Sequence, residues 1–265
     1  MTSPESFPLK NSHELENNLR AKEIAKEGNY QKIESELIEE NLLTSETERV
    51  RNKYKEVLST VEFLTEQDLK ILTILELYDE ELVLHSLETY RIAKEKSERV
   101  LAFNIKLVDL FANEGVTPEQ FFRACLLHDI GKIEIPNFII NNAIHNHEME
   151  LLLRNLVLDE KDAPTLLKLN ERTGENLDIN DESELSEILN KYNLRSVHFV
   201  PVRSILNEKE KETLIKQGFD LNQSLMDIIR THEEHSQAIL EKEGLIIESE
   251  LAGSHHNYHG KGSPY

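Results

Sequence analysis

The stretch Leu126-Leu127-His128-Asp129-Ile130-Gly131-Lys132 joins the apolar end of a helix-like segment to a histidine, an aspartate and a lysine. Adjacent imidazole and carboxylate side chains can offer a nitrogen and an oxygen ligand to one cation. At the C-terminus of a helix, the partial negative charge of that terminus also favours a bound cation. The stretch therefore predicts a metal site that is built into a helical fold.

The helix that leads into this pair has a recognisable start. Thr117 suits the N-cap, Pro118 the first helical position, and Gln120 completes a capping box. At the other end we expect Gly131 to supply a left-handed cap residue, while Pro136 prevents the helix from continuing. The histidine and the aspartate are therefore expected at the end of one well-defined helix.

A second pair of candidate ligands lies upstream, in a segment with a helical pattern from about residue 69. On a helical wheel Glu81 and His85 share one face, four residues apart. The other residues within about 60° of His85 are Ile74, Tyr78, Leu82, Thr89 and Ile92. A histidine on such a face is more often a core residue, but an inward glutamate is costly unless it is paired or binds a cation. The pair is therefore a candidate for metal binding.

A third segment, from about Leu221 to Lys242, is amphipathic and contains two histidines. His232 lies in the middle of its apolar face, whereas His235 falls at the edge. The residues that share the face of His232 are Leu221, Leu225, Ile228, Ile229, Ser236 and Ile239. We therefore select His232 as the ligand.

The last candidates are His255 and His256, in a segment rich in glycine and histidine that ends at Tyr265. An expression tag is an alternative source of such a segment, but an interrupted histidine pattern makes a poor tag. A loop that carries two adjacent ligands is the preferred interpretation.

The composition is that of an acidic, soluble, helical protein. The chain has 265 residues with 30 Lys+Arg and 50 Asp+Glu, a formal net charge of −20. Such a charge repels nucleic acid and anionic membranes, so neither is expected as a partner. A small anionic substrate can still bind where metals reverse the field locally. A single cysteine, Cys125, and the lack of an apolar leader or membrane-length segment together favour a cytoplasmic protein.

With 9 Gly and 7 Pro, turns are few and we expect an all-α fold. A helical N-terminal region is expected at residues 1–68, with helices over residues 12–66, followed by one domain at residues 69–265. Residues 141–205 have the polar, turn-rich composition of an insertion. The histidines of this insertion are interpreted as surface or structural residues: His145, His147 and His198.

Histidine and carboxylate ligands without cysteine favour iron, manganese, zinc or similar divalent ions. Two such ions about 3.5–4 Å apart, bridged by a carboxylate such as that of Asp129, lower the pKa of a shared water and clamp the oxygens of a phosphoryl displacement. Lys132, three residues after Asp129, is placed to reach a phosphate oxygen. The ordered series therefore predicts a hydrolytic phosphate centre in which Asp129 and Lys132 take part in catalysis.

The series resembles the HD superfamily of metal-dependent phosphohydrolases, and within it the HD-GYP branch. His85-Ser86 is similar to the first motif of that branch, and His128-Asp129-Ile130-Gly131-Lys132 matches its signature. The segment from His232 to Leu240 is similar to its His-x3-Gly-x3-Leu helix, with Ser236 in place of the glycine. The resemblance covers about residues 69–140 and 205–265.

The resemblance implies an HD-domain helical bundle that binds two or three divalent ions, usually iron or manganese, with zinc, magnesium and nickel as alternatives. The implied ligands are His85, His128, Asp129, His232, His255 and His256. Glu81 would serve a third metal, and Lys132 would contact the substrate phosphate. The usual activity of the branch is cleavage of cyclic di-GMP, a bacterial signalling nucleotide. We also expect the N-terminal helices to be available for a homodimer.

The end of the chain departs from the family pattern His-His-Glu-x2-Asp-Gly-x-Gly-Tyr-Pro. Asn257 replaces the glutamate, and the Gly-Tyr-Pro element is rearranged in His259–Tyr265. The final aspartate ligand of the family lies further downstream, so either the sequence is truncated or this ligand is lacking.

Three functions therefore stay open. The leading one is a phosphodiesterase that cleaves a cyclic dinucleotide. The second is a catalytically silent HD domain that binds a nucleotide or a partner and signals through its N-terminal helices, which the altered loop favours. The third is an HD hydrolase of nucleoside mono- or polyphosphates.

Overall fold

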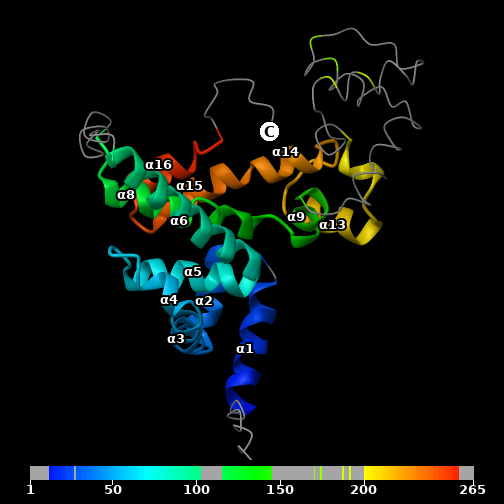
Figure 1. Ribbon diagram of the computed structural model, residues 1–265. Coiled ribbons are helices and arrows are strands. Elements are labelled where there is room, and N and C mark those ends of the chain that lie inside the picture. Colours follow the sequence, from blue (N-terminus) through cyan, green and yellow to red (C-terminus); the bar gives the residue numbers. More distant parts are fainter. Residues whose placement is uncertain are drawn as a thin grey trace, which may run out of the picture. The chain divides into compact units, whose positions relative to one another are not determined.

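The computed structural model describes residues 12–26, 28–102, 115–144 and 200–256, together with residues 170, 174, 187 and 191. Within these residues every regular element is a helix, and the only β-type pairing is an isolated bridge between Pro201 and Ser224 (Figure 1). The predicted all-α fold class is therefore confirmed. None of the described helices combines the length and the apolar character that crossing a membrane requires.

The chain separates into two compact units. The first contains residues 1–134 and 236–253, and the second contains residues 135–235 and 254–265. The first unit thus includes both the predicted N-terminal region and the beginning of the predicted HD-like domain. The boundary proposed at residue 68 stays a prediction.

Helix α5 (Glu66–Tyr78) forms the centre of the first unit. Nearly every residue from Leu69 to Tyr78 is buried, as expected for a helix that other elements surround. The elements in contact with it are α1 (Ser12–Ala25), α2 (Tyr30–Glu39), α3 (Leu43–Lys53), α6 (Glu80–Ala102), α8 (Pro118–Leu127) and η1 (Ile130–Glu134). A short α4 (Lys55–Leu58) follows α3. The helices predicted in residues 12–66 are thus confirmed.

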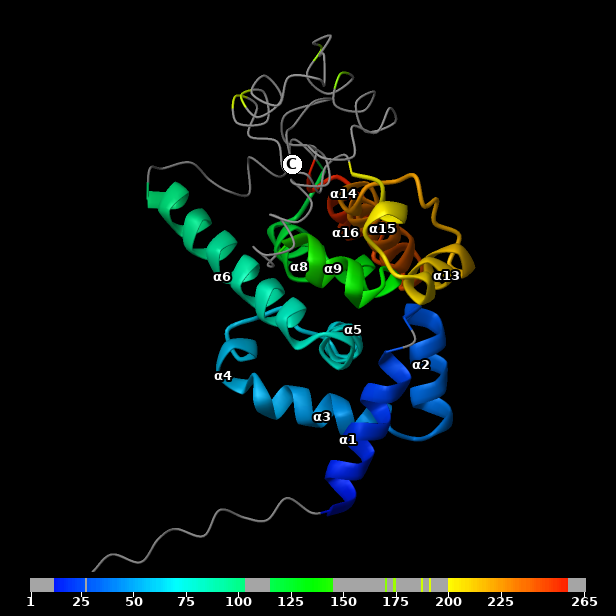
Figure 2. The ribbon, with the colours of Figure 1, turned by 90° about the vertical axis from the view of Figure 1, so that its right-hand side faces the viewer.

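Helix α8 lies in contact with both α6 and α16 (Ile246–Ala252). Figure 2 shows α6 as the longest of these three helices. The predicted capping box of α8 is present: the Gln120 amide donates to Thr117 Oγ1 over 3.2 Å, and the Thr117 amide donates to Gln120 Oε1 over 2.9 Å. This cap defines where the helix begins, and His128 is the C-cap residue at its other end.

The single helix predicted to carry the face from Ile74 to Ile92 is wrong, because the chain is extended at Asp79. The Asp79 carboxylate accepts a hydrogen bond from the Glu81 amide over 3.0 Å, so Asp79 caps α6 instead of continuing α5. The buried face of α6 is consequently rotated away from the predicted one, and it contains Leu82, Val83, Ser86, Leu87 and Tyr90. His85 lies beside this face, and Ile92 is 42% exposed.

The second unit contains five described helices or parts of helices: α9 (Asn137–Ile144), η3 (Val202–Ser204), α13 (Glu208–Lys216), α14 (Leu225–Arg230) and the first residues of α15 (His232–Lys242). Helix α14 contacts α9. Most of the predicted insertion lies outside the described residues, and so do His145, His147 and His198.

The continuous helix predicted from Leu221 to Lys242 is also wrong in two respects. Ser224 caps the start of α14 by accepting a hydrogen bond from the Asp227 amide over 3.1 Å, so the helix begins at Leu225. Thr231 then divides α14 from α15, and its hydroxyl donates to the Ile228 carbonyl over 2.7 Å. Serine and threonine hydroxyls compete with helical hydrogen bonding in this way.

Candidate metal centres

His85, His128 and Asp129 offer ligand atoms that all lie within 4.8 Å of one another in the first unit. The Nε2 atom of His128 lies 3.2 Å from Oδ2 of Asp129, and Nε2 of His85 lies 3.4 Å from the same oxygen. Helix α6 supplies His85, while the turn after α8 supplies the other two. The structure thus brings together three residues that the sequence analysis identified as candidate ligands in two separate segments.

The ring of His128 is oriented by the backbone of its own helix. His128 is the C-cap residue of α8, and its Nδ1 atom lies 3.0 Å from the carbonyl oxygen of Cys125. When Nδ1 carries the proton and donates it to this carbonyl, the lone pair of Nε2 is directed to the side of Asp129. Metal-bound histidines are commonly held by such a hydrogen bond.

Lys132 also contacts Asp129. Its Nζ atom donates to Asp129 Oδ2 over 2.7 Å, and the two residues are only 9% and 1% exposed. A carboxylate this deeply buried requires positive charge nearby. Lysine and a bound cation can provide that charge together.

His85 lies on the solvent-exposed side of this group, since 55% of its side chain is exposed. Partial burial lowers the pKa of His85; Lys132 and His128 act in the same direction, and Asp129 opposes them. The lowered pKa favours the neutral imidazole, which is the form that binds a cation.

The predicted left-handed cap at Gly131 is wrong. Gly131 lies within the 3-10 helix η1, and it is not among the described residues with positive φ. Its amide donates instead to Ser236 Oγ over 2.8 Å, and the same hydroxyl donates to the His128 carbonyl over 2.6 Å. Ser236 therefore provides from another helix the hydrogen bonds that a left-handed glycine cap would have provided locally.

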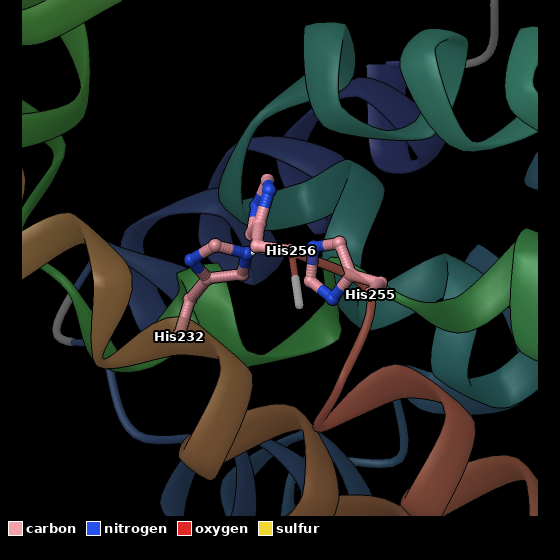
Figure 3. Close-up of side chains that lie close together, drawn as sticks. All are labelled: His232, His255 and His256. Carbon is pink, nitrogen blue, oxygen red and sulfur yellow. Dashed lines mark hydrogen bonds between the residues drawn. The ribbon is translucent and has the colours of Figure 1, made fainter. Parts of the chain in front are cut away.

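His232, His255 and His256 form a second group in the second unit, again with ligand nitrogens within 4.8 Å of one another (Figure 3). The Nδ1 atom of His232 lies 2.5 Å from the Ile229 carbonyl, which repeats the arrangement seen at His128. Its Nε2 atom lies 3.1 Å from Nε2 of His255. Two facing imidazole nitrogens at this distance need a shared proton or a shared cation.

The two remaining histidine and carboxylate candidates lie outside both groups. Glu81 is exposed in the first turn of α6 and belongs to neither group in the described part of the chain. His235 is half-buried and is likewise in neither group, whereas His232 is 1% exposed. Of these two histidines, only His232 lies in one of the described groups, and its role as a ligand stays a prediction.

The donor atoms of both groups fit a divalent cation of the iron, manganese or zinc type. One group offers two imidazoles and a carboxylate, and the other offers three imidazoles. Cys125, next to the first group in sequence, is no competitor, because burial raises the pKa of its thiol to about 12.

Sequence reasoning missed the part that Ser236 plays beside the first group. The available signal was a serine where the resembling family has a glycine, on the same face as His232. Nothing in that signal indicated that the hydroxyl would reach a turn 105 residues away.

Part of the chain is similar to a known protein family. Residues 82–188 match the model of the HD domain, and the matched segment contains His85, His128, Asp129 and Lys132. No curated protein and no solved structure matches the chain. Residues 82–188 are therefore similar to the HD domain.

Proposed function

We propose that this protein is a metal-dependent phosphohydrolase in which His85, His128 and Asp129 hold a divalent cation. The observation that carries the proposal is the convergence of both histidines on one buried carboxylate oxygen that also accepts a hydrogen bond from Lys132. A site for a structural ion does not need a buried lysine beside the ligands. At a site for a phosphate such a lysine has a use, because an ammonium group binds phosphate oxygens well.

The residues of this group have separable roles. A bound divalent cation would supply Lewis-acid polarisation of a phosphoryl oxygen. Lys132 would contact another oxygen of the same phosphate, and its contact with Asp129 fixes where the ammonium group stands before substrate arrives. The exposed side of His85 leaves this group open to an incoming ligand. The all-histidine group would hold a second cation.

For the substrate, we propose a small nucleotide with a phosphodiester bond, of which a cyclic dinucleotide such as cyclic di-GMP is the first candidate. The support is the order of motifs, which resembles the HD-GYP branch from His85 to His256. Hydrolysis of a nucleoside mono- or polyphosphate would use the same ligands and the same lysine, and it differs only in the substrate bound.

A catalytically silent domain is a second candidate, because Asn257 stands where the resembling branch has a glutamate. Such a domain would bind metal and nucleotide without releasing a product. The two functions therefore agree on binding and differ only in turnover.

The test combines metal analysis with a cleavage assay. Protein purified with and without air is examined by elemental analysis, then incubated with cyclic di-GMP, other cyclic dinucleotides and nucleoside mono- and polyphosphates. We expect iron or manganese, and cleavage of one member of this panel. Nucleotide binding by calorimetry with no product would favour the silent domain, and a failure to bind any divalent cation would remove the proposal.

A matched pair of histidine variants separates the role of the second group from general damage. His232→Ala is expected to lower metal content and turnover, whereas His235→Ala, three residues along the same helix, is expected to leave both near the wild-type level. Equal losses in both variants would show that α15 is merely sensitive to substitution.

A further inference from the structure

Ser236 lies at a junction between two elements of the first unit. It is fully buried, it belongs to α15, and its hydroxyl forms two hydrogen bonds with the turn after α8. It accepts from the Gly131 amide over 2.8 Å and donates to the His128 carbonyl over 2.6 Å. One hydroxyl therefore satisfies a buried donor and a buried acceptor at once.

These two backbone groups bracket Asp129. The His128 carbonyl precedes the Asp129 residue, and the Gly131 amide precedes Lys132, so the bridged segment holds the ligand pair and the lysine in one turn. Carbonyls at a helix C-terminus have no partner within the helix. Without Ser236 both groups would lose these buried partners, and a shift of the turn that restores them would move the side chains it carries.

A hydroxyl suits this position for geometric reasons. It is the smallest side-chain group that donates and accepts at the same time. Alanine can do neither, and glycine would leave space where the hydroxyl now stands. Cysteine is nearly the same size but forms much weaker hydrogen bonds. Replacing the serine by cysteine therefore weakens the two hydrogen bonds, whereas replacing it by alanine removes them.

We propose that Ser236 is a positioning residue of the metal centre: its hydroxyl sets the direction of the His128 and Asp129 ligand atoms and of Lys132. This inference rests on the proposed function, because it assumes that the first group binds a cation. Residues that support metal ligands in this way typically change metal affinity by about 10–100-fold when they are removed.

The experiment measures Mn²⁺ binding by calorimetry in full-length protein. A His255→Ala, His256→Ala background removes the second group, so that the signal reports on the first. In this background Ser236→Ala is expected to weaken Mn²⁺ binding by about 10–100-fold, and Ser236→Cys by less. In otherwise wild-type protein, Ser236→Ala is expected to lower kcat with little change in KM, because the reacting groups are misplaced while substrate binding persists.

Ser249 provides the matched control. It is also a fully buried serine of the first unit, and its hydroxyl donates to the Ile246 carbonyl of its own helix over 2.7 Å. Ser249→Ala therefore removes a buried hydroxyl without touching the turn after α8, and we expect its Mn²⁺ affinity to be that of the background protein.

Three outcomes decide the matter. If Ser236→Ala binds Mn²⁺ as tightly as the background while the wild type turns over substrate, the positioning role is wrong and the proposed function stands. If Ser249→Ala weakens binding as much as Ser236→Ala, the effect is loss of stability and the role is again wrong. If the background and wild-type proteins bind no Mn²⁺ and cleave nothing, both proposals fall. If the Ser236→Ala protein does not fold, the Mn²⁺ affinity of the Ser236→Cys protein is compared with that of the background instead.

Discussion

At the scale of single residues, the first metal group depends on one carboxylate oxygen. Asp129 Oδ2 lies 2.7 Å from Lys132 Nζ, 3.2 Å from His128 Nε2 and 3.4 Å from His85 Nε2. The contact between Asp129 and Lys132 was predictable, because side chains three residues apart in a helical turn lie on the same face. The short distance between His85 and Asp129 was not predictable, since it depends on how α6 packs against α8.

Asp129→Asn is predicted to abolish tight cation binding by this group, because it removes the charge and keeps the shape. Loss of a supporting residue costs about 10–100-fold in affinity, so loss of the ligand itself should exceed about 100-fold. Calorimetry with Mn²⁺ measures this. Asp79→Asn is the matched control: asparagine caps helices as well as aspartate does, so α6 and the metal affinity should both persist. Undiminished binding in Asp129→Asn would exclude the residue as a ligand.

The variant Glu81→Gln tests whether the protein binds a third metal ion through Glu81, in addition to the two expected from the described groups. The exposed position of Glu81, outside both described groups, leads us to expect the same metal content per chain in this variant as in the wild type. Elemental analysis of both proteins decides it. Loss of one metal equivalent would instead support the role that the family resemblance gives to Glu81.

At the scale of elements, the capping pattern of α8 was predictable, whereas the breaks at Asp79 and Thr231 were not. Thr117 and Gln120 form a cap from their own spacing alone. Asp79 and Thr231 lie inside segments whose apolar periodicity continues on both sides. A polar residue there can point outward from a helix or end it, and only the packing of the two halves decides between these outcomes.

The N-terminus of α2 is held by contacts with residues far away in the sequence, which a local sequence pattern cannot predict. Glu134, at the end of η1, accepts hydrogen bonds from the Tyr30 amide over 2.8 Å and from Asn29 Nδ2 over 3.2 Å. The Tyr30 hydroxyl donates to Glu243 over 3.1 Å, just beyond the end of α15. A carboxylate at a helix N-terminus also interacts favourably with the helix dipole. One turn of the N-terminal region thus holds the ends of two elements that carry site residues.

Glu134→Ala is predicted to lower the free energy of unfolding by about 1–2 kcal/mol, because it removes a charged partner from the first turn of α2. Urea unfolding followed by circular dichroism measures the change. Glu39→Ala, an exposed glutamate in the last turn of the same helix, should cost much less. Similar losses in both variants would mean that the docking contact contributes little.

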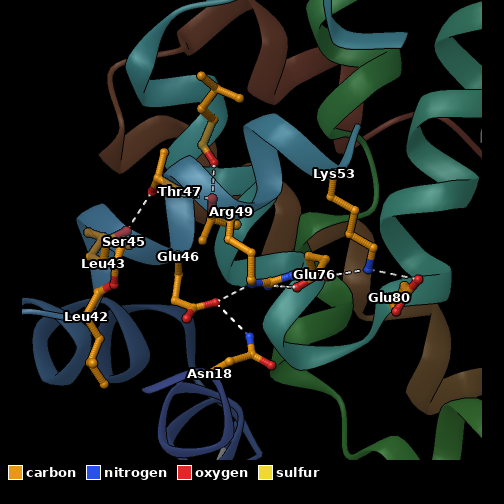
Figure 4. Close-up of polar contacts among 12 residues, drawn as sticks. Asn18, Leu42, Leu43, Ser45, Glu46, Thr47, Arg49, Lys53, Glu76 and Glu80 are labelled. Atoms are coloured by element: carbon orange, nitrogen blue, oxygen red, sulfur yellow. Dashed lines mark hydrogen bonds and ion pairs between the residues drawn. The ribbon is translucent and has the colours of Figure 1, made fainter. Parts of the chain in front are cut away.

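At the scale of the whole chain, acidic residues outnumber basic ones by 50 to 30, yet the interior of the first unit uses both. Figure 4 shows Glu76 of α5 in contact with Arg49 and Lys53 of α3, while Glu46 of α3 contacts Arg49 and Asn18 of α1. Composition predicted a helical protein with an acidic surface. It could not predict which charges would be buried, because three of these contacts, Asn18–Glu46, Arg49–Glu76 and Lys53–Glu76, join residues that are 23 to 28 positions apart.

The buried carboxylate of Glu76 gives this network a pH dependence of known sign. Burial alone raises the pKa of Glu76, but its hydrogen bonds and charge contacts with Arg49 and Lys53 prevail, so that the pKa is lowered from 4.5. A carboxyl group whose pKa is lower in the folded than in the unfolded protein stabilises the fold fully above its unfolded pKa. That contribution is lost as the pH falls through the folded pKa.

Glu76→Gln is therefore predicted to destabilise the protein markedly near neutral pH and progressively less below about pH 4.5. The measurement is urea unfolding of both proteins at several pH values between about 3 and 7. Glu66→Gln is the control, since Glu66 also contacts an arginine, Arg51, but has 77% of its side chain exposed; its effect should be small at every pH. A difference between wild type and Glu76→Gln that stays constant across this range would mean that the network contributes packing rather than charge. Convergence of the two stabilities in acid would identify Glu76 as a residue whose ionisation holds α3 against the central helix.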